Sequence, residues 1–211
     1  MQPIKDYVII EPQSPERKTE SGLIIVTDYD PSSHVPVIGT VKELPLKLSS
    51  NKPIELQVGD IVYMDRYACL MAWGREVSEE SISKDNSVIL IDGVKHFYIN
   101  YGNVYMAIRD GKKIMVNDYV LMTAVKRQEK SKLVIEKEFY SDLIFRCELG
   151  NDEIDEGQYI VIKRARSSKA NLQYYVSPVE QHIYRTLDKE YYVVKAENII
   201  GILNDITLDI R

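Results

Sequence analysis

Short apolar clusters recur along the first half of the chain, and residues that favour turns separate them. Val, Ile and Tyr dominate these clusters, and such side chains suit the pleated, half-buried surface of a strand. Several short strands at regular spacing predict an all-β barrel or sandwich. The strand-length clusters are residues 7–10, 23–27, 37–41, 61–64, 88–91, 97–99 and 104–108.

Helix signals are weak by comparison. Only residues 71–83 and 177–187 could hold a helical turn, and neither segment keeps an amphipathic stripe over three turns. No apolar run approaches the roughly 18 residues that a membrane-spanning helix needs. The pattern therefore predicts an all-β protein without a membrane partner.

The same landmarks occur twice in the same order, which is the signature of a duplicated domain. A similar apolar strand follows each landmark. Glu43-Leu44 and Glu148-Leu149 give an intermediate match, and the spacings on both sides of it indicate that the second copy has lost parts of two loops. The principal pairs are Asp6 and Asp118, Gly59 and Gly157, and Asn103 and Asn198.

The length of the chain agrees with two domains. Its 211 residues suffice for two domains of about 100 residues each. The polar stretch Asp110-Gly111-Lys112-Lys113 lies between the copies and is too short to be a flexible linker. The sequence thus predicts one domain over residues 1–110 and a second over residues 111–211.

The charge and the cysteine content of the chain indicate which partners and which cellular location to expect. The chain has 27 Lys and Arg residues against 32 Asp and Glu residues, so it lacks the basic excess of a nucleic-acid-binding protein. Cys69 and Cys147 are too few for a disulfide framework. The amino-terminal residues lack the pattern of a signal or transit peptide. We expect a cytoplasmic protein with reduced, buried thiols and no nucleic-acid partner.

The sequence holds no recognisable motif for catalysis. No Ser, Cys or His lies in a nucleophile motif, and residues 111–113 lack the glycine-rich loop and the hydroxyl residue of a P-loop. His34, His96 and His182 lie far apart, which argues against zinc ligation and favours surface or strand-edge positions. We therefore expect no catalytic residue, no metal, no cofactor and no enzymatic activity.

Each copy resembles a GroES-type co-chaperonin, on features that are complete in the first copy. The whole chain resembles a tandem, double-length member of that family, such as the chloroplast form, and its source stays open between bacterial, phage and trimmed plastid. The resemblance implies two tandem GroES-like β-barrels with long hairpin loops. The features are Pro3-Ile4-Lys5-Asp6-Tyr7-Val8, Ser21-Gly22-Leu23-Ile24-Ile25-Val26-Thr27, Gly39-Thr40-Val41, Val58-Gly59-Asp60-Ile61-Val62 and Asn103-Val104-Tyr105-Met106-Ala107-Ile108, with a roof hairpin implied over residues 46–56.

The second copy departs from the family pattern. Its turn reads Glu156-Gly157-Gln158, no glycine precedes Leu133, and its roof shrinks to about residues 150–155. We interpret it as a degenerate copy. Both copies are longer than the family pattern after the turn, and the segments where we expect extra structure are residues 66–86 and 164–187.

Residues 11–21 have the composition of a solvated, mobile segment, with two prolines, many charges and no large apolar side chain. The apolar run after them is a plain strand when only its pattern is considered. The resemblance instead implies that this run docks into an apolar groove of a GroEL-type chaperonin while the loop orders around it. The implied chaperonin-binding residues are Gly22, Leu23, Ile24, Ile25 and Val26.

Leu133, Val134 and Ile135 hold the equivalent place in the second copy, with charged residues on both sides. One interpretation is a short edge strand that those charges protect from aggregation. The other is a second chaperonin-binding loop. The sequence leaves both open.

The resemblance implies a co-chaperonin that caps the ATP- or ADP-bound ring of a GroEL-type chaperonin and assists protein folding. It also implies that copies of the chain form a homo-oligomeric ring. The alternative is an oligomeric structural or assembly protein that uses GroES-like barrels as a scaffold and binds no chaperonin.

Overall fold

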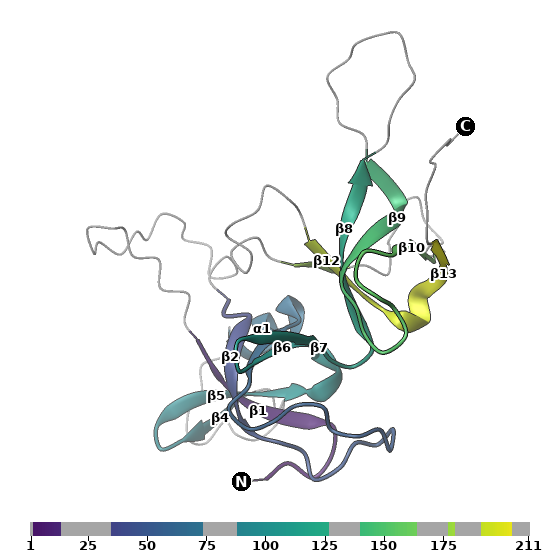
Figure 1. The fold of residues 1–211 in the computed structure, drawn as a ribbon. Helices are drawn as coiled ribbons and strands as arrows, with labels where there is room; N and C mark the ends of the chain where they lie inside the picture. The colour runs from purple at the N-terminus through teal and green to yellow at the C-terminus, as the bar shows by residue number, and fades with distance from the viewer. Residues whose placement is uncertain are drawn as a thin grey trace, which may run out of the picture. The chain divides into compact units, whose positions relative to one another are not determined.

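The chain folds into two compact units. Unit 1 covers residues 1–117 and unit 2 covers residues 118–211 (Figure 1). Each unit is built around one antiparallel sheet, so the expected all-β fold is confirmed. The computed structural model describes residues 2–13, 35–73, 88–126, 140–163, 177–179 and 191–203.

Unit 1 contains a seven-stranded sheet in the order β4-β5-β1-β2-β3-β6-β7. The strand clusters expected from the sequence correspond to strands of this sheet, except residues 23–27, which lie outside the described residues. The strands are β1 (Tyr7–Pro12), β2 (Ile38–Glu43), β3 (Ile61–Met64), β4 (Val88–Ile91), β5 (Val94–Asn100), β6 (Val104–Arg109) and β7 (Lys112–Met115).

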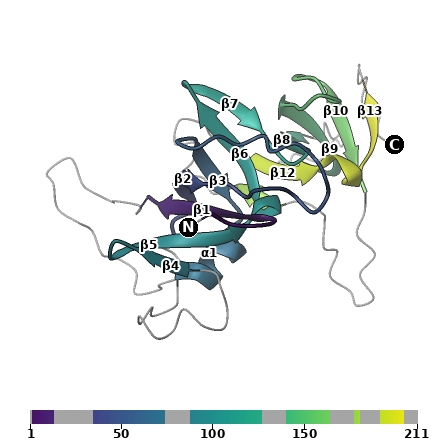
Figure 2. The same ribbon diagram turned by 90° about the horizontal axis from the view of Figure 1, so that it is seen from below.

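Unit 2 contains a six-stranded sheet in the order β11-β12-β8-β9-β10-β13. Strand by strand, this order is that of β4-β5-β1-β2-β3-β6 in unit 1. Figure 2 shows the outer strands of both sheets, with β7 beside β6 and β13 beside β10. The strands are β8 (Tyr119–Lys126), β9 (Tyr140–Leu149), β10 (Tyr159–Ile162), β11 (Ser177–Val179), β12 (Tyr191–Lys195) and β13 (Ile199–Leu203).

The irregularities of the two sheets match as well. The register of β1 on β2 shifts between Ile9 and Ile10, and that of β8 on β9 shifts at the equivalent place after Leu121. A second shift occurs before Met64 in the β3–β6 ladder and before Ile162 in the β10–β13 ladder. Since a bulge bends the strand that carries it, both sheets bend at equivalent positions.

The first of these bulges corrects the register expected from the sequence. Ile9 pairs with Glu43, and Leu121 pairs with Leu149. Glu43 therefore corresponds to Leu149, and the expected match of Glu43 with Glu148 was wrong by one residue. The difference matters because a one-residue slip moves every side chain of a strand to the other face.

The unit boundary lies later than the one expected after residue 110. Residues Lys112–Met115 form β7, which pairs with β6, and Val116 lies in the core of unit 1. Asp110 and Gly111 both have positive φ angles, +51° and +76°, as the two central residues of a tight hairpin turn require. Asp110 and Gly111 of the polar stretch thus form a hairpin turn, and Lys112 and Lys113 begin β7.

Two helical expectations fare differently. Helix α1 (Arg66–Trp73) lies in the expected extra segment 66–86 and begins earlier than the 71–83 window. Its start is capped, because the Asp65 carboxylate accepts the backbone N–H of Ala68 at 3.0 Å. The second window was wrong at its start, since Ser177–Val179 form strand β11, which pairs with β12.

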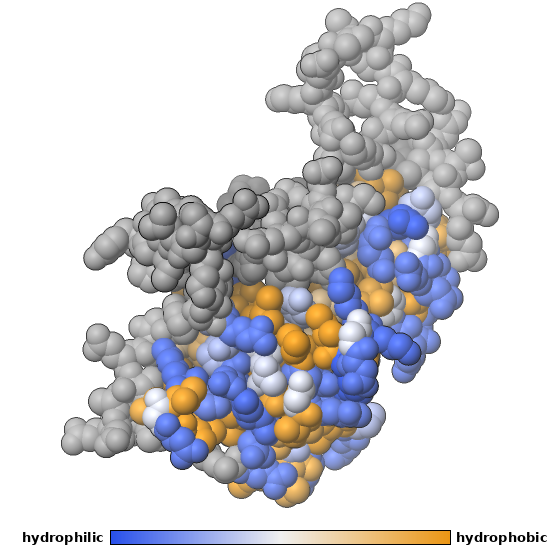
Figure 3. Space-filling model, turned by 60° about the vertical axis from the view of Figure 1, so that its left-hand side comes forward, coloured by the Kyte–Doolittle hydropathy of each residue, from blue (hydrophilic) through white to orange (hydrophobic). Residues whose placement is uncertain are grey.

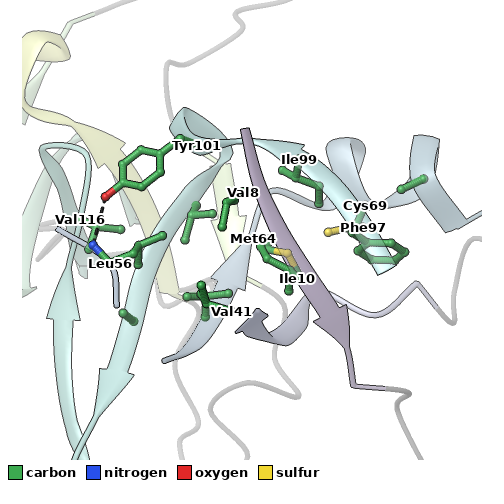
Figure 4. Close-up of a cluster of buried hydrophobic side chains, with 14 of the residues drawn as sticks. Val8, Ile10, Val41, Leu56, Met64, Cys69, Phe97, Ile99, Tyr101 and Val116 are labelled. Carbon is green, nitrogen blue, oxygen red and sulfur yellow. Dashed lines mark hydrogen bonds between the residues drawn. The ribbon is translucent and has the colours of Figure 1, made fainter. Parts of the chain in front are cut away.

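The main core cluster of unit 1 gathers side chains from several strands of its sheet (Figure 4). Val8 and Ile10 on β1 belong to it, together with buried residues of the neighbouring strands, of α1 and of the 46–56 loop. Ile9 lies between them and would point to the other face of a regular strand, yet it is 0% exposed as well. The labelled core residues are Val8, Ile10, Val41, Leu56, Met64, Cys69, Phe97, Ile99, Tyr101 and Val116.

The core of unit 2 uses equivalent strand positions. Val120 and Met122 on β8 correspond to Val8 and Ile10 on β1. The ring of Phe145 meets that of Tyr192 edge to face at 5.6 Å between centroids. The buried members described are Val120, Met122, Phe145, Cys147, Ile154, Ile160, Ile162 and Val194.

The burial of the two cysteines and of one histidine can be compared with the positions expected from the sequence. Cys69 and Cys147 are buried thiols, as expected. His96 was expected at the surface or at a strand edge, but it is 6% exposed on β5, between β4 and β1. Its Nδ1 lies 2.9 Å from the carbonyl oxygen of Val94. Within the described residues, no helix is long and apolar enough to cross a bilayer.

Candidate functional site

The segments expected to bind a chaperonin lie outside the described residues. The structure describes instead the strands from which these segments leave and to which they return. That framework decides where each segment is attached and how firmly its ends are held. The residues concerned are Gly22, Leu23, Ile24, Ile25 and Val26 in unit 1 and Leu133, Val134 and Ile135 in unit 2.

Both ends of the unit 1 segment meet at one place. Residues 14–34 connect β1 to β2, and these strands are antiparallel neighbours. Pro12 pairs with Gly39, and the backbone N–H of Gln13 donates to the carbonyl of Ile38 at 2.9 Å. The described residues at both ends of the segment therefore lie on adjacent strands, where the ladder holds them.

The base of this loop is held by packing more than by charge. Val35 and Val37, on the returning side, are buried at 3% and 2% exposure. Lys42 forms an ion pair with Glu11 across the two strands, and its hydrogen bond lowers the pKa of that carboxyl. Both partners are about 40% exposed, so solvent screens this pair and it contributes little.

The unit 2 segment has the same attachment. Residues 127–139 connect β8 to β9, the counterparts of β1 and β2, and Lys126 pairs with Tyr140 at the base. The two expected binding segments thus occupy the same connection in the two sheets. The strand order therefore agrees with the equivalence expected from the sequence landmarks.

The implied roof hairpin over residues 46–56 is not formed. Apart from a bridge between Lys47 and Lys5, the segment is a loop without strands. Ser49 holds one side of it, since its backbone N–H donates to the Asp6 carboxylate at 2.7 Å and its hydroxyl also bonds that carboxylate. These bonds lower the pKa of Asp6.

Tyr101 holds the other side of the 46–56 loop. Its hydroxyl accepts the backbone N–H groups of Glu55 at 2.7 Å and of Leu56 at 3.1 Å, and Figure 4 shows the second bond. The ring itself is 2% exposed in the core. A single aromatic side chain therefore links the core of unit 1 to this loop.

A buried ion pair closes the turn between the 46–56 loop and β3. Asp60 is 3% exposed and accepts two bonds from Arg109, at 3.0 Å from Nε and 2.7 Å from Nη2. It also accepts the N–H of Gln57 at 2.8 Å. Burial raises the pKa of Asp60, but these bonds and the guanidinium charge outweigh it, so the pKa lies below its usual value.

The sequence analysis missed three residues of this framework. Tyr101 anchors the 46–56 loop as described, and Arg109 Nη2 donates to the carbonyl of Glu55 in the same loop at 2.8 Å. The Asn117 side chain donates to the carbonyls of Tyr101 at 2.8 Å and Val104 at 2.7 Å. Nothing in the local pattern marks Tyr101. A cation at the end of the closing strand, opposite a Gly-Asp turn, is a signal that could have found Arg109.

The surface of the described residues shows no cluster of metal-ligating side chains. Figure 3 shows apolar residues at several separate places on one face, among hydrophilic ones. Among the described residues, no cluster of His, Cys, Asp and Glu could hold a metal ion. The framework can present loops but, in its described part, gathers no set of reactive side chains.

Comparison with known proteins identifies the family. Residues 1–108 match the model of the chaperonin 10 Kd subunit, Cpn10. A co-chaperonin GroES from Coprothermobacter proteolyticus is 34% identical over 71 residues, which are 32% of this chain and 70% of that protein. A co-chaperonin GroES from Rhodothermus marinus is 39% identical over 71 residues, which are 32% of this chain and 68% of that protein.

These matches confirm the resemblance to GroES-type co-chaperonins. Co-chaperonins are not enzymes, and at this level the family agrees with a chain that carries no catalytic motif. With the model matched over residues 1–108 and two relatives more than 30% identical over two thirds of their length, the chain belongs to the chaperonin 10 kDa subunit family.

Proposed function

We propose that this chain is a co-chaperonin that caps the nucleotide-bound ring of a GroEL-type chaperonin and assists protein folding there. The contact is made by Gly22, Leu23, Ile24, Ile25 and Val26, carried on the loop 14–34. The observation that carries the proposal is the base of that loop, on adjacent strands of a unit that belongs to the family. The proposal includes a homo-oligomeric ring and the cytoplasm as its location.

The energetics suit a lid that binds and releases. Burying one aliphatic side chain contributes roughly 1.5–3 kcal/mol, and ordering the loop offsets much of the sum over three side chains. A single loop therefore binds weakly. Several loops on one assembly turn later contacts into intramolecular ones, so that avidity exceeds single-loop affinity by about 10²- to 10⁴-fold.

We include Leu133, Val134 and Ile135 as a second contact in this proposal. The segment 127–139 connects β8 to β9 as the segment 14–34 connects β1 to β2, which supports an equivalent role. Leu133, Val134 and Ile135 lack a preceding glycine and have charges on both sides, so we expect this contact to be the weaker of the two.

Polar substitution tests the first contact. Changing Ile24 and Ile25 together to Ser removes apolar area from the loop and no residue of the described cores. We expect at least a 100-fold loss of capture by a GroEL-type chaperonin with ATP, measured by analytical ultracentrifugation. Val58→Ser is the control, because Val58 is a 62% exposed apolar side chain elsewhere in unit 1. Capture unchanged in the double variant would refute the contact.

Two further variants separate the alternatives. Leu133→Ser with Val134→Ser should weaken capture by less than the Ile24 and Ile25 change; an equal or larger loss would reverse the order of the two contacts. Replacing residues 14–34 by a short Gly/Ser turn should abolish capture and leave self-assembly intact. If the wild-type chain assembles but does not bind a GroEL-type chaperonin, the protein is a structural scaffold instead.

A further inference from the structure

Two equivalent loops of the two units carry opposite charge. The 46–56 loop lies between β2 and β3 of unit 1, and the 150–155 loop lies between β9 and β10 of unit 2. The first loop holds Lys47 and Lys52 against one acidic residue, Glu55. The second loop and the residue after it hold four acidic residues and no basic one. These acidic residues are Asp152, Glu153, Asp155 and Glu156.

Three lysines are exposed at the loop of unit 1. Lys47 forms a bridge with Lys5, so these two lysines lie on neighbouring segments of backbone. Lys52 lies farther along the loop, and all three residues are exposed. The two acidic residues beside them, Asp6 and Glu55, each accept a backbone N–H group at 2.7 Å. The lysines outnumber these carboxylates, so this surface carries an excess of positive charge.

The four carboxylates of unit 2 are exposed as well. Ile154 lies among them but is 3% exposed, and it anchors the loop in the core of unit 2. Within the residues that the structure describes, no basic side chain forms an ion pair with any of the four. Their negative charge is therefore directed to solvent, where a basic partner can meet it.

Both loops are held in place by their own units. In unit 1 the Tyr101 hydroxyl and the Asp6 carboxylate hold the two sides of the loop. In unit 2 Asn151 Oδ1 accepts the N–H of Ile154 at 3.1 Å. Gly150 packs so closely that a Cβ there would overlap the carbonyl of Ile154. A loop that is already held loses little conformational entropy when a partner binds.

Charges of this kind select a partner more than they strengthen its binding. A single exposed ion pair adds little to affinity, because solvent screens it. Like charges that face each other are strongly unfavourable, and unlike charges speed the encounter of two surfaces. Two basic loops or two acidic loops therefore repel each other. Between two copies of the chain, the charges favour a contact of unit 1 with unit 2.

We propose that the 46–56 loop of one copy binds the 150–155 loop of a second copy, with the lysines of the first facing the carboxylates of the second. The contact is head-to-tail, because the two loops that meet are different surfaces of the chain. A duplicated chain can make such a contact since its two units are free to differ in charge. The inference rests on the self-association in the proposed function and specifies which surfaces meet.

Charge reversal on either loop tests the contact. One full-length variant carries Lys47→Glu and Lys52→Glu, so both of its loops are acidic. A second carries Asp152→Lys, Glu153→Lys and Glu156→Lys, so both of its loops are basic. In about 0.1 M salt, we expect the dissociation constant of the assembly to rise by roughly 10-fold or more in either variant, measured by analytical ultracentrifugation.

A matched control changes the same net charge elsewhere. Lys112→Glu with Lys163→Glu alters two lysines that are exposed on β7 and after β10. We expect this control to assemble as the wild-type chain does. A rise in its dissociation constant equal to that of the loop variants would show that net charge alone matters, and would overturn the inference.

Mixing separates a contact between copies from a contact within one chain. The two reversed chains, mixed in equal amounts, should regain the wild-type dissociation constant, because an acidic loop of one again meets a basic loop of the other. Recovery only when all five changes are combined in one chain would place the contact within that chain and overturn the inference. A defect that neither mixing nor combination repairs would overturn it too.

Salt gives an independent readout. The screening length falls from about 10 Å at 0.1 M salt to about 3 Å at 1 M, so the advantage of the wild-type chain over the reversed chains should vanish at 1 M. Reversed chains that assemble normally in low salt overturn the inference and leave self-association standing. A wild-type chain that stays monomeric at all concentrations overturns both, whereas loss of chaperonin capture alone affects only the proposed function.

Discussion

Units 1 and 2 share their backbone scaffold but differ in the side chains that fasten it. The N–H of Val41 donates to the carbonyl of Asp60 at 2.9 Å, and in unit 2 Cys147 donates to Gln158 at 2.8 Å. In the other direction, the N–H of Gly59 donates to the carbonyl of Val41, and the N–H of Gly157 donates to the carbonyl of Cys147. Both of these bonds are 2.9 Å long. The backbone hydrogen bonds of the strands and turns thus define the fold, and the side-chain bonds that stabilise the turns can differ between the units.

The turn before the third strand shows this most clearly. Gly59 and Gly157 have φ angles of +94° and +88°, which favour glycine. The next residue caps the turn in both units, through the Asp60 carboxylate or through Gln158 Oε1, which accepts the N–H of Asp155 at 3.0 Å. Of these two capping residues, only Asp60 also binds a guanidinium, that of the partly buried Arg109, so charge locks the turn in unit 1 and not at Gln158.

The 3₁₀ turns before the closing strands differ in a similar way. Those turns are η2 (Tyr101–Asn103) and η4 (Ala196–Asn198), and each is bonded to the carbonyl of its aspartate, from Tyr101 to Asp6 at 2.6 Å and from Ala196 to Asp118 at 2.9 Å. Tyr101 has a hydroxyl that holds a long loop, and Ala196 has none. In unit 2 the corresponding loop, residues 150–155, is shorter and is closed by a bond within itself. Asn151 Oδ1 accepts the N–H of Ile154 at 3.1 Å.

Breaking the charge lock should have the largest effect on this comparison. Asp60→Asn leaves Arg109 beside a neutral amide in a mostly buried site, so we expect unit 1 to lose about 3 kcal/mol of unfolding free energy. The matched change, Gln158→Ala, removes one neutral bond and should cost unit 2 about 1 kcal/mol. The only tryptophan, Trp73, lies in unit 1, so its fluorescence in urea reports that unit, and hydrogen exchange reports unit 2.

Equal losses in the two variants would show that the ion pair adds nothing beyond the turn bond. Arg109→Met separates these terms, because it removes the cation and keeps the cap from Asp60 to Gln57. We expect it to be as destabilising as Asp60→Asn.

Removing the hydroxyl of Tyr101 should have the next largest effect. Tyr101→Phe leaves the N–H groups of Glu55 and Leu56 without their acceptor, and Leu56 is 2% exposed. We expect a loss of about 2 kcal/mol in unit 1, together with faster hydrogen exchange over residues 46–56. Unit 2 should not respond. Unchanged exchange in that loop would mean that Asp6 and Ser49 hold it without Tyr101.

Acid should weaken unit 1 through Asp60. The pKa of Asp60 is lower in the folded chain than in the unfolded one, so the unfolded state takes up the proton first as the pH falls below about 4. The stabilisation is complete above that pH and is lost as the pH falls through the folded pKa. We expect the urea midpoint from Trp73 fluorescence to fall between about pH 5 and pH 3. The fall should be smaller in Asp60→Asn, and an identical fall would assign it to other carboxylates.

Thiol labelling should give the smallest and most local difference. Burial raises the pKa of Cys147 to about 11, and both cysteines are buried, so labelling requires opening of the unit that holds the thiol. Among its described residues, unit 2 has no counterpart of the Asp60 lock, of the Tyr101 anchor or of β7. We therefore expect Cys147 to be alkylated before Cys69 in low urea. Mass spectrometry of the labelled chain measures the extent of alkylation at each cysteine. The reverse order would make unit 2 the more stable one.

The sequence by itself determined the strands and the repeat. Apolar clusters between turn residues marked most strands of unit 1, because a half-buried strand must alternate or concentrate its apolar side chains. The paired landmarks at Asp6 and Asp118 and at Gly59 and Gly157 marked the duplication, because only a few residue types adopt positive φ angles there without strain. The resemblance to the family followed from the order of these features.

Tertiary structure alone decided the rest. The polar stretch 110–113 looks like a connection between two domains, but pairing with β6 places Lys112 and Lys113 in strand β7, because the local pattern does not show which strand a segment pairs with. Tyr101, Arg109 and Asn117 became anchors for the same reason, as each bonds groups far from it along the chain. The exposure of Ile200 and Ile202 on β13 likewise appears only in the folded unit, because burial depends on neighbours that the chain brings together in folding.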